Sequence, residues 1–173
     1  MYKFLKNIIN KDEAVILHTT QDYLDICEFI QHSALKFGIN IKIEISSPAV
    51  HRDLFSSGAS SFFRASWIGD YPDPENFLSL FYSKNKSPFG PNYTHFSSEV
   101  YDSLYELSFY SNDFANRCNL FKQMESILLG EATIIPLYYD HVVRLVSKRI
   151  NGMSINSMNT LSLKKVKKQI IFD

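Results

Sequence analysis

Hydrophobic and polar residues alternate with two different periods in the first third of the chain. Residues 14–20 (AVILHTT) form a short, β-branched run typical of a strand, and the apolar positions of residues 23–37 recur every three or four residues, as in an amphipathic helix. Gly38 stands where a helix C-cap glycine belongs, and residues 39–45 (INIKIEI) alternate with a period of two. This order predicts a βαβ unit with two parallel strands.

The middle of the chain predicts short elements separated by proline and glycine. Pro48 opens a short helix that Gly58 ends, and residues 61–67 (SFFRASW) predict a third strand. The Asp73-Pro74 pair predicts a helix start, because the carboxylate accepts hydrogen bonds from free amides of the first turn and proline loses none there. Further elements are expected in this order: a short helix at 75–82, a long loop at 83–98, helices at 99–110 and 113–130, and strands at 134–138 and 142–147.

Strands that alternate with helices predict an α/β fold, with a mixed, mostly parallel sheet flanked by helices. The length suits a single domain over residues 1–173. Val100, Leu104 and Leu107 form an apolar stripe on the first long helix, and Phe121 and Met124 lie on a second stripe. Both stripes are expected to face the core.

Composition excludes several classes of protein. The chain has 173 residues, with 18 Lys and Arg against 18 Asp and Glu, so its formal charge is zero and no global field attracts nucleic acid. The chain is 45% apolar, as in globular proteins, but no apolar run approaches the roughly 20 residues that span a bilayer. Residues 1–15 lack the apolar core of a secretory signal, so we expect no signal peptide in this chain.

The sequence shows no signature of an enzyme or a metal site. The six glycines are too dispersed for a phosphate-binding loop, and no two of the five histidines share a helix face at metal-ligand spacing. Cys27 lies on the apolar stripe of its helix, where a thiol is inert, and we expect Cys27 and Cys118 to be buried free thiols. We therefore expect no catalytic residues, no cofactor and no metal.

One segment, RASWIGDYPDP at residues 64–74, combines charged and aromatic residues where a predicted strand ends. Ligands bind at the carboxyl ends of strands in open α/β sheets. Asp73 already has a structural role as a helix cap, whereas Asp70 has no evident local role beyond a turn, and Trp67 is the only tryptophan of the chain. The residues alone leave two interpretations open: a ligand site, or a turn aspartate beside a core tryptophan.

The stretch WIGDYPDPENFLSLFYS resembles the hallmark of the extracellular solute-binding proteins of family 5, which serve peptide and oligopeptide ABC transporters. Four further segments are similar to the family's pattern and occur in the same order, over about residues 14–166. They are the helix-Gly-Ile-strand segment around Gly38, Tyr101-Asp102-Ser103-Leu104, the helix through Gln123 and Glu125, and the strand Ile135-Pro136-Leu137-Tyr138.

The resemblance implies roles for three residues. Asp70, three residues after the tryptophan, would pair with the amino terminus of a peptide ligand, and Trp67 would help to wall the cleft. Arg64, three residues before the tryptophan, stands where some oligopeptide-binding members hold the ligand's carboxylate, and Tyr71 completes the candidate set. A buried ammonium group needs such a paired carboxylate, because an unpaired charge in the interior is costly.

The resemblance also implies an architecture and partners. The chain would be the carboxy-terminal, periplasmic-binding-protein-like lobe of a longer, two-lobed protein, with the first lobe absent from this chain. That protein would be a monomer that binds a peptide or other small solute between its lobes and delivers it to a membrane permease, without contacting nucleic acid. It would be periplasmic or anchored at the cell surface as a lipoprotein. The alternatives are a binder of a nickel chelate, sugar or other non-peptide solute, and an interaction domain that has lost the site.

Overall fold

The predicted βαβ unit forms the first part of the fold. The computed structural model describes residues 14–139, 141–156 and 158–169. Strands β1 (Val15–Thr19) and β2 (Ile41–Ile45) pair in parallel, and η1 (Gln21–Tyr23) and α2 (Leu24–Leu35) connect them. Gly38 has φ +76°, which an L side chain rarely adopts, so glycine permits the sharp return from α2 into β2.

The predicted strand at residues 61–67 is wrong in extent, because only an isolated parallel bridge joins Phe63 to His18 of β1. The His18 N–H donates to the Phe62 carbonyl (3.0 Å), and the Arg64 N–H donates to the His18 carbonyl (2.9 Å). The Arg64 carbonyl then meets the His51 side chain of α3 (Pro48–Ser56), 2.8 Å from Nε2. The His51 side chain thus occupies the Arg64 carbonyl, at which the hydrogen-bond ladder between the two segments would have continued.

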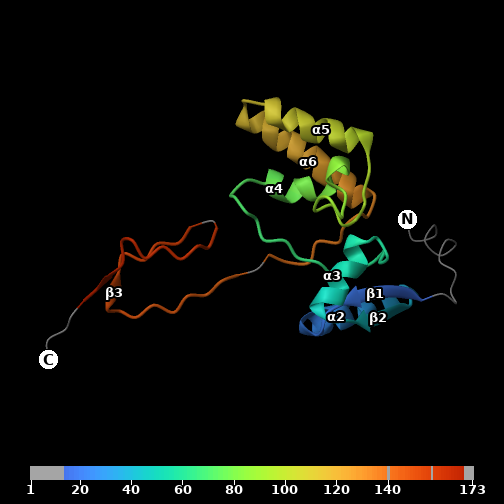
Figure 1. Ribbon diagram of the computed structural model, residues 1–173, viewed down its shortest axis with the longest axis horizontal. Helices are drawn as coiled ribbons and strands as arrows, with labels where there is room; N and C mark the ends of the chain where they lie inside the picture. Colours follow the sequence, from blue (N-terminus) through green and yellow to red (C-terminus); the bar gives the residue numbers. More distant parts are fainter. Residues whose placement is uncertain (1–13, 140, 157, 170–173) are drawn as a thin grey trace.

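Three helices form a second layer, in the upper part of Figure 1: α4 (Glu75–Leu78), α5 (Glu99–Tyr110) and α6 (Phe114–Gly130). The short helix η2 (Ser79–Phe81) extends α4, and η3 (Ser83–Asn85) follows it. Their apolar side chains form one buried cluster, and the βαβ unit forms another around Leu17, Cys27 and Ile41. The helical cluster contains Leu78, Phe81, Tyr101, Tyr105, Phe121, Met124 and Leu128.

The buried face of α5 differs from the predicted stripe. Leu104 packs against the buried cluster as predicted, but Val100 and Leu107 are 64% and 55% exposed. Tyr101 and Tyr105 are buried in their place. The tyrosines can occupy the buried face because their hydroxyls find acceptors: the Tyr101 hydroxyl donates to the Leu78 carbonyl (2.7 Å), and that of Tyr105 donates to a carboxylate of α4. On α6 the prediction is confirmed for Phe121 and Met124, which are buried, as is Leu128.

The predicted strands at 134–138 and 142–147 are absent from the described residues. These segments are extended but lie beside no neighbouring strand with which they could form a ladder, and Leu145 is 97% exposed. A short antiparallel pair, β3 (Ile150–Asn151) and β4 (Lys167–Lys168), joins the two sides of an arm that projects away from the helices (Figure 1). With parallel β1–β2 and antiparallel β3–β4, the fold is α/β with mixed strand pairing.

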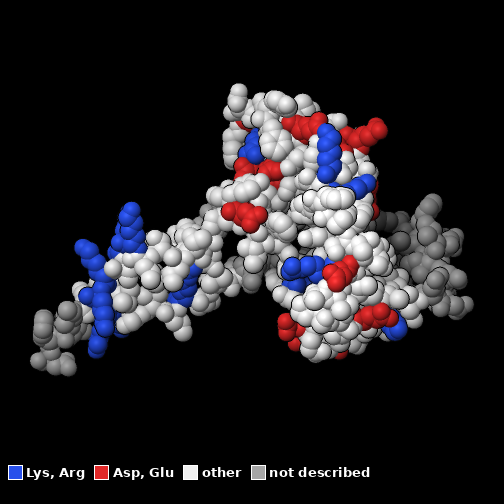
Figure 2. Space-filling model, viewed as in Figure 1, with Lys and Arg blue, Asp and Glu red and all other residues white. Residues whose placement is uncertain are grey.

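Charge is distributed unevenly over the neutral chain. The arm, residues 141–169, contains seven Lys and Arg and no Asp or Glu, and Figure 2 shows its basic side chains separated from the acidic ones on the rest of the molecule. The lysines of the 164–168 patch are exposed, as a solvated face requires. In the described ranges, no helix combines the length and the apolar character needed to cross a bilayer. Residues 1–13, on which the signal-peptide expectation depends, lie outside those ranges.

Candidate functional site

Three of the four predicted site residues lie around one buried amide. Asn76, in the first turn of α4, is 3% exposed, and its Oδ1 accepts hydrogen bonds from Trp67 Nε1 (2.8 Å) and from the Asp70 backbone N–H (3.3 Å). Asp70 itself is exposed, and among the described residues its carboxylate forms no hydrogen bond or ion pair. The site therefore offers a free carboxylate on a backbone that α4 holds in place.

Asp73 has the structural role that the sequence predicts. Its Oδ1 accepts the Glu75 N–H (2.9 Å), and its two oxygens bind the Arg117 guanidinium of α6 at 2.6 and 3.1 Å. Burial by itself would raise the pKa of the Asp73 carboxyl, but the hydrogen bonds from Arg117 and from the Glu75 N–H outweigh it and hold that pKa below its ordinary value. Asp73 is therefore occupied, in contrast to Asp70.

A buried carboxylate lies beneath the same loop. Glu75 is 7% exposed, and its oxygens accept hydrogen bonds from the hydroxyls of Tyr71 and Tyr105. The bond to Glu75 raises the pKa of Tyr71, whereas burial is the main cause of the raised pKa of Tyr105, with the Glu75 bond second. Both phenols thus stay protonated at neutral pH and connect the loop to α5.

Arg64 is attached to a different part of the fold. Its guanidinium carbon lies 3.0 Å from the centre of the Tyr23 ring, and its Nη1 donates to Ser66 Oγ (3.3 Å). These contacts hold the side chain against η1, while Trp67, Asp70 and Tyr71 are connected through α4. The structure therefore joins three predicted residues into one group and gives Arg64 separate partners.

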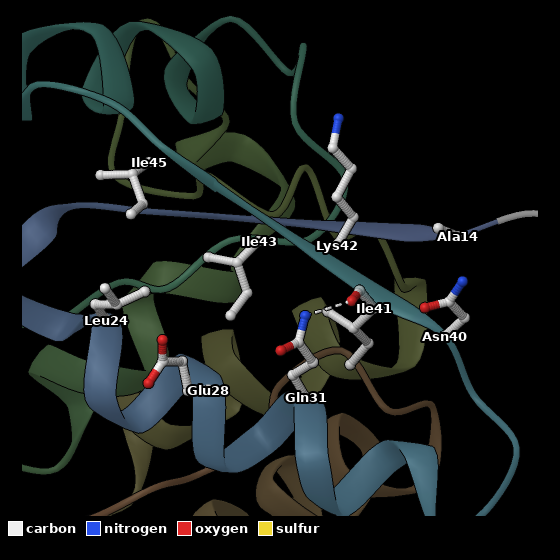
Figure 3. Close-up of a pocket in the computed structure, with 9 residues that line it drawn as sticks. All are labelled: Ala14, Leu24, Glu28, Gln31, Asn40, Ile41, Lys42, Ile43 and Ile45. Atoms are coloured by element: carbon white, nitrogen blue, oxygen red, sulfur yellow. Dashed lines mark hydrogen bonds between the residues drawn. The ribbon is translucent and has the colours of Figure 1, made fainter.

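Two surface hollows lie away from these residues. The larger, about 590 Å³, lies between α2 and the free edge of β2, where Ile41, Ile43 and Leu24 form apolar walls (Figure 3). Gln31 spans part of it by donating to the Ile41 carbonyl (2.7 Å). The smaller, about 360 Å³, lies beside Tyr105. Neither hollow is lined by a predicted site residue, and within the described ranges no group of three or more His, Cys, Asp or Glu could hold a metal ion.

Sequence reasoning missed the residues that support the site, namely Asn76, Glu75, Tyr105 and Arg117. Asn76 and Glu75 occupy a helix start in the sequence, where both residue types are common at the surface. Tyr105 and Arg117 are 30 and 44 residues away from the carboxylates that they contact, so no local pattern connects them. One available signal was the pair Tyr101 and Tyr105, one helical turn apart beside the predicted apolar stripe, because buried phenols require acceptors.

The cysteines agree in part with expectation. Cys27 is free and fully buried in the core of the βαβ unit, and Cys118 is free and half-buried on α6. Neither contacts the loop that carries the predicted site in any hydrogen bond of the described residues.

Comparison with known proteins finds similar sequences among peptide-binding proteins. The chain is 28% identical over 120 residues to the periplasmic murein peptide-binding protein MppA of Escherichia coli, and 28% identical over 158 residues to the dipeptide-binding protein DppE of Bacillus subtilis. These matches cover 69% and 90% of this chain but 22% and 28% of the relatives, so the chain spans about a quarter of their length. No protein-family model matches the chain.

Solved structures share the fold. The unliganded, open form of MppA superposes with a TM-score of 0.75 at 24% identity, over 88% of this chain and 30% of that one. The ABC transporter substrate-binding protein CtaP of Listeria monocytogenes gives 0.79 at 17% identity, over 96% and 36%. By sequence and by fold, the chain is therefore similar to part of the extracellular solute-binding proteins of family 5, the peptide-binding proteins of ABC transporters.

Proposed function

We propose that the chain forms part of the substrate-binding component of an ABC importer, and that the Asp70 carboxylate pairs with the amino terminus of a peptide. The observation that carries this proposal is the contrast between two neighbouring aspartates. Asp73 is bound by Arg117 and by a backbone N–H, whereas Asp70 is exposed and its carboxylate has no partner among the described residues. A carboxylate that the fold leaves unused is available for a cation from outside.

The neighbours of Asp70 fit the same role. Trp67 uses its only donor on Asn76, so its ring faces remain for apolar contact with the first residues of a ligand. Tyr71 is 44% exposed although its hydroxyl is bound to Glu75, which also leaves an aromatic surface beside Asp70. Arg64 would meet the carboxylate of a longer ligand, and that contact would add to its packing on Tyr23.

The proposal includes a larger assembly. In it, the chain is one α/β lobe, and closure against a second lobe removes the ligand from water and presents a closed shape to a membrane permease. We propose that this protein acts as a monomer in the periplasm or as a lipoprotein at the cell surface. Recognition by a few local charges suits a chain whose formal net charge is zero.

A hydrolase is a weaker alternative on geometric grounds. Ser87 Oγ lies 3.1 Å from His95 Nε2, a serine–histidine contact that could suggest a nucleophile and its base. However, Ser87 Oγ also lies 2.5 Å from the Ser56 carbonyl, which can only accept, so the hydroxyl donates there. His95 must then donate to Ser87 and cannot take its proton, and Ser87 is 6% exposed. This pair favours a packing role and supports a binding protein.

The test uses the whole chain and one chemical difference in the ligand. We expect Ala-Ala at millimolar concentration to shift the ¹⁵N-HSQC signals of the Asp70 amide and the Trp67 indole, and N-acetyl-Ala-Ala to leave them unchanged, because only the first carries an ammonium. Asp70→Asn should abolish the shift, and Asp53→Asn, which removes another exposed carboxylate, should not. Equal shifts with both peptides would contradict the role of Asp70, and no shift with either peptide would favour a non-peptide solute.

The same substitution has a larger expected effect in a protein of the relatives' full length. There the ion pair would be shielded from water, and breaking one partner of a buried pair costs roughly 2–5 kcal/mol. Isothermal titration calorimetry would measure it, and unchanged peptide affinity in Asp70→Asn would reject the assignment.

A further inference from the structure

Asn76 touches more of the candidate site than any residue that the sequence singled out. We infer that Asn76 is the positioning residue of the site, which holds the Trp67 ring and the Asp70 backbone in the arrangement that receives the ligand. The inference rests on the proposed function for its ligand, but the arrangement itself is measurable without one. Asn76 is 3% exposed and so acts through its neighbours.

The orientation of the Asn76 amide is determined by its partners. Trp67 Nε1 and the Asp70 backbone N–H are donors that cannot accept, so the oxygen of the amide must face both, at 2.8 and 3.3 Å. The amide nitrogen faces the other way, and the Asn76 amide opposes the effect of Glu75 on the pKa of Tyr71. One side chain thus binds two of the four predicted residues by hydrogen bonds and affects the pKa of a third.

The first part of the loop, from Trp67 to Asp70, has few other restraints among the described residues, whereas Tyr71 and Asp73 are bound to Glu75 and Arg117. It has no regular secondary structure, and the Asp73 N–H to Tyr71 carbonyl bond (2.9 Å) is a local turn. Gly69 brings the loop close to α4: a Cβ there would lie 3.3 Å from the Phe77 ring and 3.5 Å from Asn76 Oδ1. A side chain at this position would therefore press against the Phe77 ring, next to the amide on which Trp67 depends.

The chemistry of the two hydrogen bonds explains why an amide is suitable. Alanine or leucine at this position would remove the acceptor and leave two N–H groups without partners on a half-buried loop, which is costly. Aspartate would keep an acceptor oxygen but would add a carboxylate next to the buried Glu75 and to Asp73. Asparagine supplies the acceptor without the charge.

The experiment uses the single tryptophan, which gives one indole N–H signal in the ¹⁵N-HSQC spectrum. In the ligand-free wild type we expect that proton to be protected from solvent exchange, relative to the urea-unfolded chain. Asn76→Ala should speed its exchange about tenfold, the typical effect of one lost hydrogen bond. Asn76→Asp should keep most of the protection, because it retains an acceptor.

The matched control is Asn92, another buried asparagine. Asn92 is 0% exposed, and its amide nitrogen donates to the Tyr82 and Phe96 carbonyls, away from the tryptophan. Asn92→Ala should destabilise the protein in urea without changing indole exchange in the folded state. Equal protection of the indole proton in the wild type and in Asn76→Ala would overturn the inference. An indole proton that exchanges freely in the wild type would also overturn it, and that result does not depend on whether a variant folds.

Titration with Ala-Ala separates this inference from the proposed function. If the wild type binds the dipeptide, Asn76→Ala should weaken binding about tenfold while Asn92→Ala does not, because only the first releases Trp67 and Asp70. Unchanged binding in Asn76→Ala would reject the positioning role. If the wild type protects its indole and yet binds Ala-Ala and N-acetyl-Ala-Ala equally well, the proposed role of Asp70 in ligand binding is wrong. In that case the positioning role of Asn76 is retained.

Discussion

Arg117 links the loop that carries the candidate site to α6, and its replacement by methionine should destabilise the protein by about 2–4 kcal/mol. Arg117 forms two bonds to Asp73, a third to the Ser108 carbonyl (3.3 Å), and a guanidinium contact 4.8 Å from the Phe121 ring centre. The ion pair contributes about 1–2 kcal/mol after allowance for solvent screening, since both side chains are 25–30% exposed. The third bond and the ring contact supply the rest.

Urea unfolding followed by tryptophan fluorescence and circular dichroism would measure this difference. Arg52→Met is the control, because Arg52 is an exposed cation on α3, and it should change the free energy of unfolding by less than about 0.5 kcal/mol. Combining Arg117→Met with Asp73→Asn should give a smaller loss than the sum of the single variants. A loss below about 0.5 kcal/mol in Arg117→Met, or strict additivity with Asp73→Asn, would refute the link.

Two further predictions concern the same helical layer. The pKa of Asp73 lies below its ordinary value of 3.8 when the chain is folded. The stability that the charged carboxylate contributes is therefore fully present above about pH 4 and is lost as the pH falls through the pKa of the folded state. Acid unfolding curves of the wild type should show this loss, and those of Asp73→Asn should not. Met124 is fully buried, so Met124→Ala should cost about 3 kcal/mol in urea unfolding. The exposed Leu145 is the control, and an equal loss in Leu145→Ala would contradict the assigned core.

The sequence predicts those elements whose cause is local. The βαβ unit and the glycine after α2 depend on periodicity or on a neighbouring residue, and both are found. The strands expected at 134–138 and 142–147 depend instead on a partner strand, which no pattern within a segment can supply. For the same reason, the strand predicted at 61–67 is reduced to a bridge.

In the candidate site, too, the features with a local cause could be predicted from the sequence and the others could not. By itself, the sequence determined that the segment from Trp67 to Asp73 is unusual and that Asp73 caps a helix, because both depend on adjacent residues. Only the tertiary structure decided which aspartate remains free, because Arg117 lies 44 residues away on α6, and only the burial of Asn76 shows what holds Trp67 and Asp70 together. Hydrogen bonds between distant segments depend on how the helices pack, and helix packing is a property of the whole fold.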